Sequence, residues 1–84
     1  MAGRLSDKVC IVTGGAKGLG RVFVSALLVE GARVAALDVA RADPVPGAVH
    51  LTCDVTDADA CRAAVAQVVE ELGTVDVLIN NAAL

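Results

Sequence analysis

Aromatic residues are almost missing from this sequence: Phe23 is the only one, and there is no tryptophan or tyrosine. The apolar residues, 56% of the chain, are therefore mostly alanine, valine and leucine. Such side chains suit strands that are buried on both faces and helices that pack against them. A chain of 84 residues makes at most one domain, and at that size only roughly 60–65% of the unfolded surface is buried on folding. We therefore expect part of a larger α/β protein.

Long hydrophobic runs and clusters of basic residues are also missing. The apolar runs are far shorter than the roughly 20 residues that cross a bilayer. The charges at Arg4, Asp7 and Lys8 are not followed by the apolar stretch of a secretory signal. The net charge of −3 disfavours nucleic acid or an anionic membrane as a partner. We expect a cytoplasmic protein that binds neither.

The cysteines lack the spacing of a metal site or a redox motif. Cys10, Cys53 and Cys61 are odd in number, lie in apolar stretches and form no C-x-x-C pair. Small buried thiols in a reducing compartment are the favoured interpretation, and a reactive thiol or metal ligand is the alternative. His50 has no Cys, Asp or Glu at ligand-like spacing. We therefore predict no metal site.

A glycine-rich stretch near the start of the chain is the strongest functional signal. The apolar run VCIV at 9–12 leads into TGGAKGLG at 13–20. A strand, a glycine turn and a helix in this order can hold an anion, because glycine lets the backbone approach a ligand and the new helix presents unpaired N–H groups. A P-loop is excluded, since Arg21-Val22 stands where Lys-Ser or Lys-Thr is required. The general G-x-G-x-x-G pattern fails at Phe23.

The hydrophobic pattern predicts four strands, at residues 8–13, 33–38, 49–55 and 75–79. Their order along the chain, with helices between them, predicts an α/β fold: a partial Rossmann-type parallel sheet with flanking helices and strand order 3-2-1-4. Between the second and third strands, residues 39–48 contain Asp43, two prolines and Gly47. These residues forbid a regular helix, so we expect one face of the sheet to be thinly covered there.

Two amphipathic helices are predicted. The first begins at Gly18 and is closed by Gly31. The second begins at a capping box formed by Thr56 and Asp59 and ends at Gly73. The apolar spacing predicts their buried faces, which are Leu19, Val22, Phe23, Ala26 and Leu27 in the first helix and Cys61, Val65, Val68 and Leu72 in the second.

Asp38 is the candidate residue for binding the adenosine ribose of a dinucleotide cofactor. It ends the second strand, 18 residues after Gly20, where a dinucleotide site uses an acid to accept hydrogen bonds from ribose hydroxyls. Its charge repels a 2′-phosphate, which favours NAD over NADP. Lys17 and Arg41 are cations that could bind such a phosphate, and NAD remains favoured over NADP. A strand-ending acid at a turn is the alternative interpretation of Asp38.

Two further polar segments end strands. Asp54-Val55 follows the third strand, where a carboxylate can accept from the adenine amine and a backbone N–H can donate to a ring nitrogen. Taken alone, Asp54 could simply begin a turn. Asn80-Asn81 finishes the fourth strand beside the first, at the point where open α/β sheets bind ligands. These amides could also only tie neighbouring loops together.

Four motifs in order, TGGAKGLG, Asp38, CDV at 53–55 and NNAA at 80–83, resemble those of the short-chain dehydrogenase/reductase family and span nearly the whole chain. The departures are the missing helix at 39–48 and Ala83, where the family most often has glycine. The resemblance implies the following cofactor contacts: Gly14, Lys17, Gly18, Leu19 and Gly20 with the pyrophosphate and ribose, Asp38 with the adenosine ribose, Asp54 and Val55 with adenine, and the Asn81 backbone with the nicotinamide-side ribose.

The family's chemistry rests on a Tyr-x-x-x-Lys pair and an upstream serine, yet this chain has no tyrosine. We therefore expect residues 1–84 to be the amino-terminal, cofactor-binding half of the domain, without catalytic residues. The resemblance implies an NAD(P)-dependent oxidoreductase that transfers hydride between nicotinamide and a small alcohol or carbonyl substrate, with a homo-oligomeric full-length form. The alternative is a catalytically inactive truncated product that acts only as a nucleotide-binding or interaction module.

Overall fold

The computed structural model describes residues 3–15, 18–39 and 44–81. The elements in this part follow one another as β1 (Val9–Thr13), α1 (Gly18–Val29), β2 (Arg33–Asp38), β3 (Val49–Thr52), α2 (Ala58–Leu72) and β4 (Val77–Asn80). The strands form one parallel sheet in the order β3-β2-β1-β4. Both the predicted Rossmann-type fold and its strand order are confirmed.

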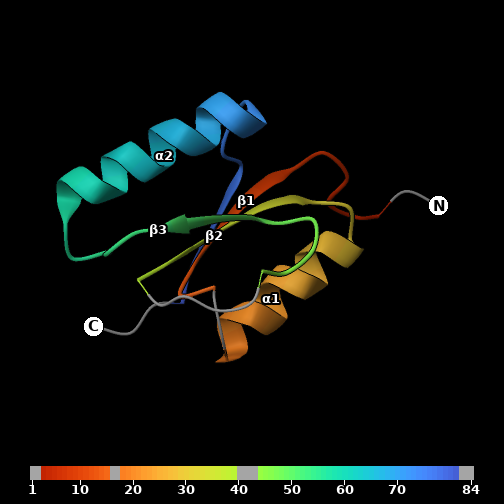
Figure 1. Cartoon of the computed structure of the whole chain (residues 1–84). Coiled ribbons are helices and arrows are strands. Elements are labelled where there is room, and N and C mark those ends of the chain that lie inside the picture. The colour runs from red at the N-terminus through yellow and green to blue at the C-terminus, as the bar shows by residue number, and fades with distance from the viewer. Residues whose placement is uncertain (1–2, 16–17, 40–43, 82–84) are drawn as a thin grey trace.

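The two helices cover opposite faces of the sheet (Figure 1). In β1, Val9 and Ile11 belong to the core cluster that includes residues of α2, whereas Cys10 and Val12 belong to the cluster that includes Val24 of α1. Successive residues of a strand point to opposite faces, so β1 is buried along its whole length. The described residues contain no helix long and apolar enough to cross a membrane.

The rotation of α1 about its axis differs from the prediction. Leu19 and Val22 are 61% and 60% exposed, and Ala26 is exposed as well. Phe23 and Leu27 pack against the core cluster on this face, as predicted, but the fully buried residues are Gly20 and Val24. Because α1 is apolar on most sides, its sequence fits more than one buried face. The glycine fixes the choice, since a Cβ at this position would lie 1.9 Å from a backbone oxygen of the preceding loop.

The buried face of α2 is largely as predicted. Val68 is fully buried, and Cys61 and Leu72 pack against the same core cluster. The prediction was wrong for Val65, which is 43% exposed, and it missed Ala64, which is buried. A small residue directly against the sheet lets the helix approach closely, and the bulkier valine then lies at the margin of the contact.

The start of α2 also differs from the predicted capping box. Asp57 is the N-cap, and its carboxylate accepts from the N–H groups of Asp59 and Ala60 at 3.0 and 3.1 Å. The Thr56 hydroxyl is engaged elsewhere, because it donates to the Asp54 carboxylate. An aspartate one position later therefore satisfies the first N–H groups of the helix.

Glycines follow both helices, as predicted. Gly31 and Gly73 have φ angles of +88° and +94°, the left-handed conformation common after a helix. Gly73 N–H donates to the carbonyl of Val69 at 2.8 Å.

The connection between β2 and β3 is described at Val39 and from Pro44 onward, and residues 40–43 lie outside the described part. Residues 44–48 form no helix, in agreement with the prediction. Val45 is buried and belongs to the cluster beneath α1, so it covers part of that face. Its N–H donates to His50 Nε2 at 2.9 Å, which fixes the turn against β3.

Three strands are shorter than predicted. β3 ends at Thr52 instead of Val55, because the Asp54 carboxylate accepts from Thr56 N–H at 2.9 Å and turns the chain toward α2. β4 runs from Val77 to Asn80 instead of beginning at residue 75. β1 begins one residue later than predicted, at Val9.

Candidate functional site

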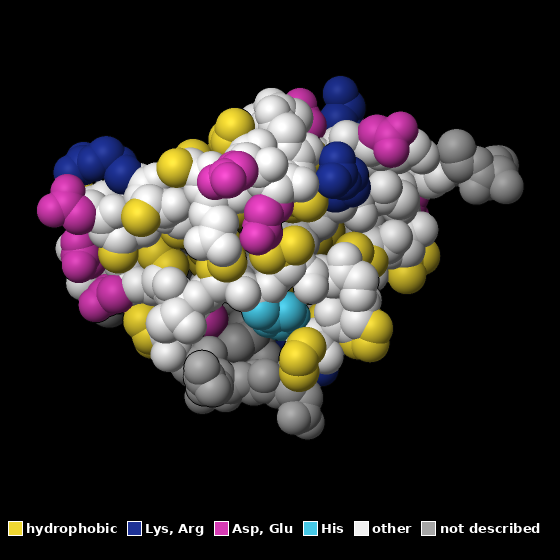
Figure 2. Space-filling view, turned by 45° about the horizontal axis from the view of Figure 1, so that its top comes forward, with side chains coloured by type: hydrophobic (Ala, Val, Ile, Leu, Met, Phe, Trp, Pro, Cys, Tyr) yellow, Lys and Arg dark blue, Asp and Glu magenta, His cyan; other side chains and the backbone are white. Residues whose placement is uncertain are grey.

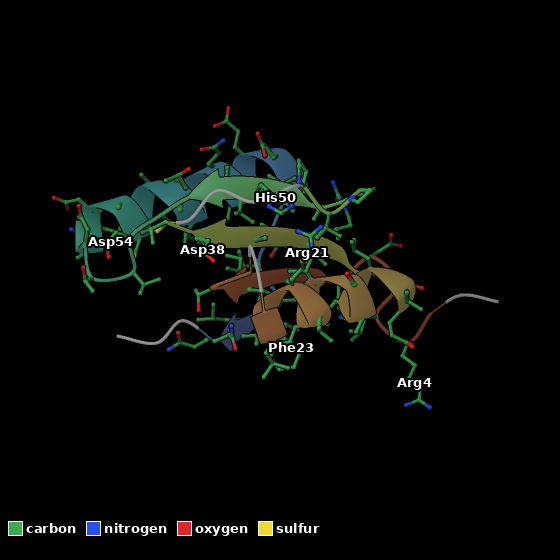
Figure 3. All side chains as sticks on the ribbon, turned by 60° about the horizontal axis from the view of Figure 1, so that its bottom comes forward. Arg4, Arg21, Phe23, Asp38, His50 and Asp54 are labelled. Carbon is green, nitrogen blue, oxygen red and sulfur yellow. The ribbon has the colours of Figure 1, made fainter. Side chains whose placement is uncertain are left out.

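The predicted site residues gather where the strands end. Thr13 of β1 is in register with Leu37 of β2 and with Asn80 of β4. Asp38 ends β2, and Asp54 follows β3; Figure 3 shows both at the same end of the sheet. Open parallel sheets bind ligands at the carboxyl ends of their strands. The topology therefore brings these residues to the edge at which a ligand site is expected.

The loop between β1 and α1 is anchored to the neighbouring strand. Gly14 N–H donates to the carbonyl of Leu37 at 2.7 Å. Gly18 opens α1 with a φ of +62°, and a Cβ built there would meet nothing within 4 Å. The backbone at Gly18 therefore borders open space in a conformation that favours glycine. Lys17 and Ala16 lie outside the described residues.

Gly20 makes the closest contact between α1 and this loop. A Cβ at Gly20 would lie 1.9 Å from the Gly14 carbonyl oxygen and 2.7 Å from Asn81 Nδ2. Real Cβ atoms do not approach other atoms this closely, so a side chain would push the helix away from the loop. The glycine therefore keeps the first turn of α1 beside the end of β1.

The first turn of α1 has the features of an anion site. Its leading N–H groups have no partner within the helix, and the helix dipole favours negative charge there. No acidic side chain lies in this turn, and Leu19 is largely exposed. Phosphate groups bind at helix N-termini of this kind. A pyrophosphate therefore fits the described residues.

Thr13 and two asparagines form a hydrogen-bond network that closes the site toward β4. Thr13 is only 7% exposed. Its hydroxyl donates to Asn80 Oδ1 at 3.0 Å and accepts from Asn81 N–H at 3.0 Å. The Asn81 side-chain amide then donates to the Gly14 carbonyl at 3.2 Å. The network ties the glycine loop to the end of β4.

The sequence analysis assigned no cofactor contact to Thr13 or Asn80, and it gave the tying of neighbouring loops as an alternative role of the Asn80 and Asn81 amides. A hydroxyl at the end of one strand and an amide at the end of its neighbour together indicate such a network, once the pairing of the two strands is known. Asn81 is a predicted site residue, and its side chain is bound to the loop. Its backbone, at the end of the strand, is therefore the part that can contact a ligand.

Asp38 is half-buried at the end of β2. Its carbonyl accepts from Cys53 N–H at 3.0 Å, which extends the pairing of β2 and β3 by one bond. The residue therefore belongs to the rigid edge of the sheet and not to a loose loop. A carboxylate fixed at this point can accept two hydrogen bonds from a ribose.

Asp54 and Val55 lie beyond β3, next to this edge. The Asp54 carboxylate is exposed, and its Oδ1 accepts from the Thr56 hydroxyl at 2.6 Å and from Thr56 N–H at 2.9 Å. These two bonds, that from the hydroxyl foremost, lower the pKa of Asp54 below its ordinary value. The carboxylate is thus charged at neutral pH. Asp54 Oδ2 has no protein partner among the described residues, so it can still accept from a ligand amine.

The described residues offer no metal centre. They contain no group of three or more His, Cys, Asp or Glu side chains that could hold an ion. His50 accepts a backbone hydrogen bond from Val45 and lies at the surface in Figure 2 (cyan), on a face over which acidic side chains are spread. The chemistry of the site is therefore that of hydrogen bonds, a helix N-terminus and carboxylates.

The fold and this edge define a Rossmann-type α/β unit with a glycine-rich loop after its first strand. The sequence profile of the short chain dehydrogenase family matches residues 8–84, and the chain therefore belongs to this family of oxidoreductases.

Individual relatives agree with this assignment. Sorbitol dehydrogenase of Cereibacter sphaeroides is 42% identical over 88 aligned positions, which cover 96% of this chain and 34% of the relative. Galactitol 2-dehydrogenase of Agrobacterium fabrum is 43% identical with the same coverage. The solved structure of ligand-free aldohexose dehydrogenase from Thermoplasma acidophilum superposes with a TM-score of 0.91 at 34% identity, over 100% of this chain and 32% of that chain. The chain thus spans about one third of the length of these relatives.

Proposed function

We propose that this chain is the cofactor-binding part of an oxidoreductase that transfers hydride between NAD and a small alcohol or carbonyl substrate. One observation carries the proposal: the glycine loop, Asp38 and Asn81 come together at the carboxyl edge of one parallel sheet. Family membership supports a nicotinamide cofactor.

The residues present fit a dinucleotide. The pyrophosphate would lie against Gly14, Gly18 and the first turn of α1, where open space borders the backbone and the helix dipole favours an anion. Leu19 and Gly20 belong to the same turn. Lys17, although outside the described residues, would add a positive charge within the loop.

The remaining contacts follow the edge of the sheet in both directions. On the adenosine side, Asp38 would accept from the ribose hydroxyls, and Asp54 and Val55 would contact adenine. On the nicotinamide side, the backbone of Asn81 would contact the second ribose. A carboxylate at Asp38 repels a 2′-phosphate, and this repulsion is the reason to propose NAD and not NADP.

The reaction itself would need residues beyond this chain. Bound nicotinamide supplies the hydride chemistry, whereas the protein must add a proton donor and acceptor beside the substrate. The 84 residues contain no tyrosine, the family's usual acid/base. We therefore propose that this chain alone binds the cofactor without catalysing hydride transfer. We propose further that the complete protein is a cytoplasmic homo-oligomer that uses neither nucleic acid nor membrane as a partner.

Two glycine substitutions test the cofactor site. Gly18→Val and Gly73→Val impose the same kind of change, because both glycines have positive φ and neither Cβ would meet an atom within 4 Å. Only Gly18 lies in the proposed site. Calorimetric titration of the full-length protein with NAD should show binding lost in Gly18→Val and kept in Gly73→Val. Equal affinities in both variants and the unmodified protein would refute the site.

A further inference from the structure

Two of the three cysteines lie side by side where β3 leads into α2. Cys53 directly follows β3 and is 3% exposed. Cys61 is in the first turn of α2 and is partly buried. Their Sγ atoms are 4.0 Å apart. A disulfide holds its sulfur atoms about 2.05 Å apart, so a bond requires them to approach by about 2 Å.

The two cysteines differ in how firmly they are held. Cys53 is fixed to the sheet, because its N–H donates to the Asp38 carbonyl at 3.0 Å. The Cys61 thiol makes only long contacts, with the carbonyls of Asp54 at 3.8 Å and Val55 at 3.6 Å. Rotation of the Cys61 side chain therefore breaks no strong hydrogen bond. The approach can come mainly from Cys61 and the first turn of its helix.

Their exposure also differs, which orders the two steps of an oxidation. Burial, followed by the contact with Cys61 and the charges of Asp54 and Asp57, raises the pKa of Cys53. Cys53 is thus held as a protonated, protected thiol, and an oxidant from solution reaches Cys61 first. Oxidation follows exposure and thiolate character. Cys10 cannot interfere, because it belongs to the core cluster on the α1 face of the sheet, whereas Cys53 belongs to the one on the α2 face.

We propose that Cys53 and Cys61 are a redox-active pair that forms a reversible intramolecular disulfide. Hydrogen peroxide oxidises the Cys61 thiol to a sulfenic acid and is reduced to one water. Cys53 sulfur then attacks the sulfenic sulfur, its proton leaves with the hydroxyl group as a second water, and the S–S bond forms. Two thiols have lost two electrons and two protons in total. A small dithiol reverses the step by thiol–disulfide exchange.

The bond would close a loop that contains Asp54 and Val55. It would also pull the Cys61 sulfur away from the carbonyls of these two residues. Oxidation is therefore expected to weaken NAD binding by about fivefold or more, the lower end of ordinary coupling between sites. This consequence, unlike the disulfide itself, rests on the proposed function.

Peptide mapping tests the pair without any cofactor. The folded, reduced full-length protein is treated with hydrogen peroxide, its free thiols are alkylated, and it is digested without reductant. Mass spectrometry should find a Cys53–Cys61 cross-linked peptide that disappears after treatment with dithiothreitol. The Cys10→Ser variant should still give this peptide, and the Cys61→Ser variant should not. The result for the unmodified protein tests the proposal even if neither variant folds.

Other results would overturn the proposal. These are alkylation of both Cys53 and Cys61 after oxidation, a sulfinic acid at Cys61 without a cross-link, or only intermolecular disulfides. The NAD titration is read separately. A mapped disulfide with unchanged NAD affinity would refute the link to the cofactor site, and failure of the reduced protein to bind NAD would refute the proposed function and leave the redox pair standing.

Discussion

Replacing Thr13 with valine removes one hydroxyl from the centre of the network that joins β1 to β4. The side chain keeps its shape and volume, so no cavity forms. The substitution deletes the bond to Asn80 Oδ1 and the bond from Asn81 N–H, both 3.0 Å long. A neutral hydrogen bond contributes about 1 kcal/mol net, so we expect a loss of about 2 kcal/mol in the free energy of unfolding. Asn81 is only partly buried, so water can reach its N–H and limit the loss.

Urea denaturation of the full-length protein measures this loss, with one slope of unfolding free energy against urea concentration fitted to all variants. Thr74→Val is the matched control: the same chemical change at an exposed residue should stay within about 0.5 kcal/mol of the unmodified protein. Thr13→Ser keeps the hydroxyl and removes one methyl, for an expected loss of about 0.8 kcal/mol. If Thr13→Val were as stable as the Thr74 control, the network would contribute nothing and our reasoning about it would be wrong.

Three further predictions concern the loop, one carboxylate and the sheet edge. Gly20→Ala should lower the free energy of unfolding by about 1–3 kcal/mol through its backbone clash, and it should weaken NAD binding. Gly18→Ala has no clash and should cost only about 1 kcal/mol of backbone strain. Equal stabilities of the two variants in urea would contradict this prediction. Asp54 has a lowered pKa because Thr56 donates two hydrogen bonds to it, so its contribution to stability is present above the ordinary aspartate pKa and is lost as the pH falls through the folded pKa. Thr56→Ala should raise that pKa in an NMR titration, and an unchanged value would speak against the hydrogen bonds as its cause. This chain expressed alone should self-associate through β4, because β4 is an edge strand and its Leu78 is 62% exposed. Leu78→Lys should shift the size-exclusion profile of the chain toward the monomer. An unchanged profile would exclude this edge as the contact.

The sequence predicts the sheet well because its strongest signals are local. The run at 9–12, the glycines after it and the next apolar run define a strand, a helix and a parallel partner without any long-range information. The order of the four strands then follows from the Rossmann-type arrangement that this succession of elements predicts. Asp38 and Asn81 could be placed at the ligand edge for the same reason, since each closes a predicted strand.

The features that the sequence did not predict depend on contacts between distant segments, or on a choice between neighbouring residues that could both take the same role. The rotation of α1 depends on the contact of Gly20 with the Gly14 carbonyl, which the apolar pattern alone cannot reveal. At the start of α2, Thr56 and Asp57 can both cap a helix, and the bond from the Thr56 hydroxyl to Asp54 decides between them. The Thr13 network joins residues 67 and 68 positions apart.

The affinity ratio for the two nicotinamide dinucleotides tests the central claim most directly. Titration calorimetry of the full-length protein should give NAD at least about tenfold tighter binding than NADP, about 1.4 kcal/mol, because the Asp38 carboxylate repels a 2′-phosphate. Asp38→Ser should reduce this ratio, and Glu70→Gln, which removes an exposed charge from α2, should leave it unchanged. Tighter binding of NADP by the unmodified protein, or a ratio that does not respond to Asp38→Ser, would contradict the account.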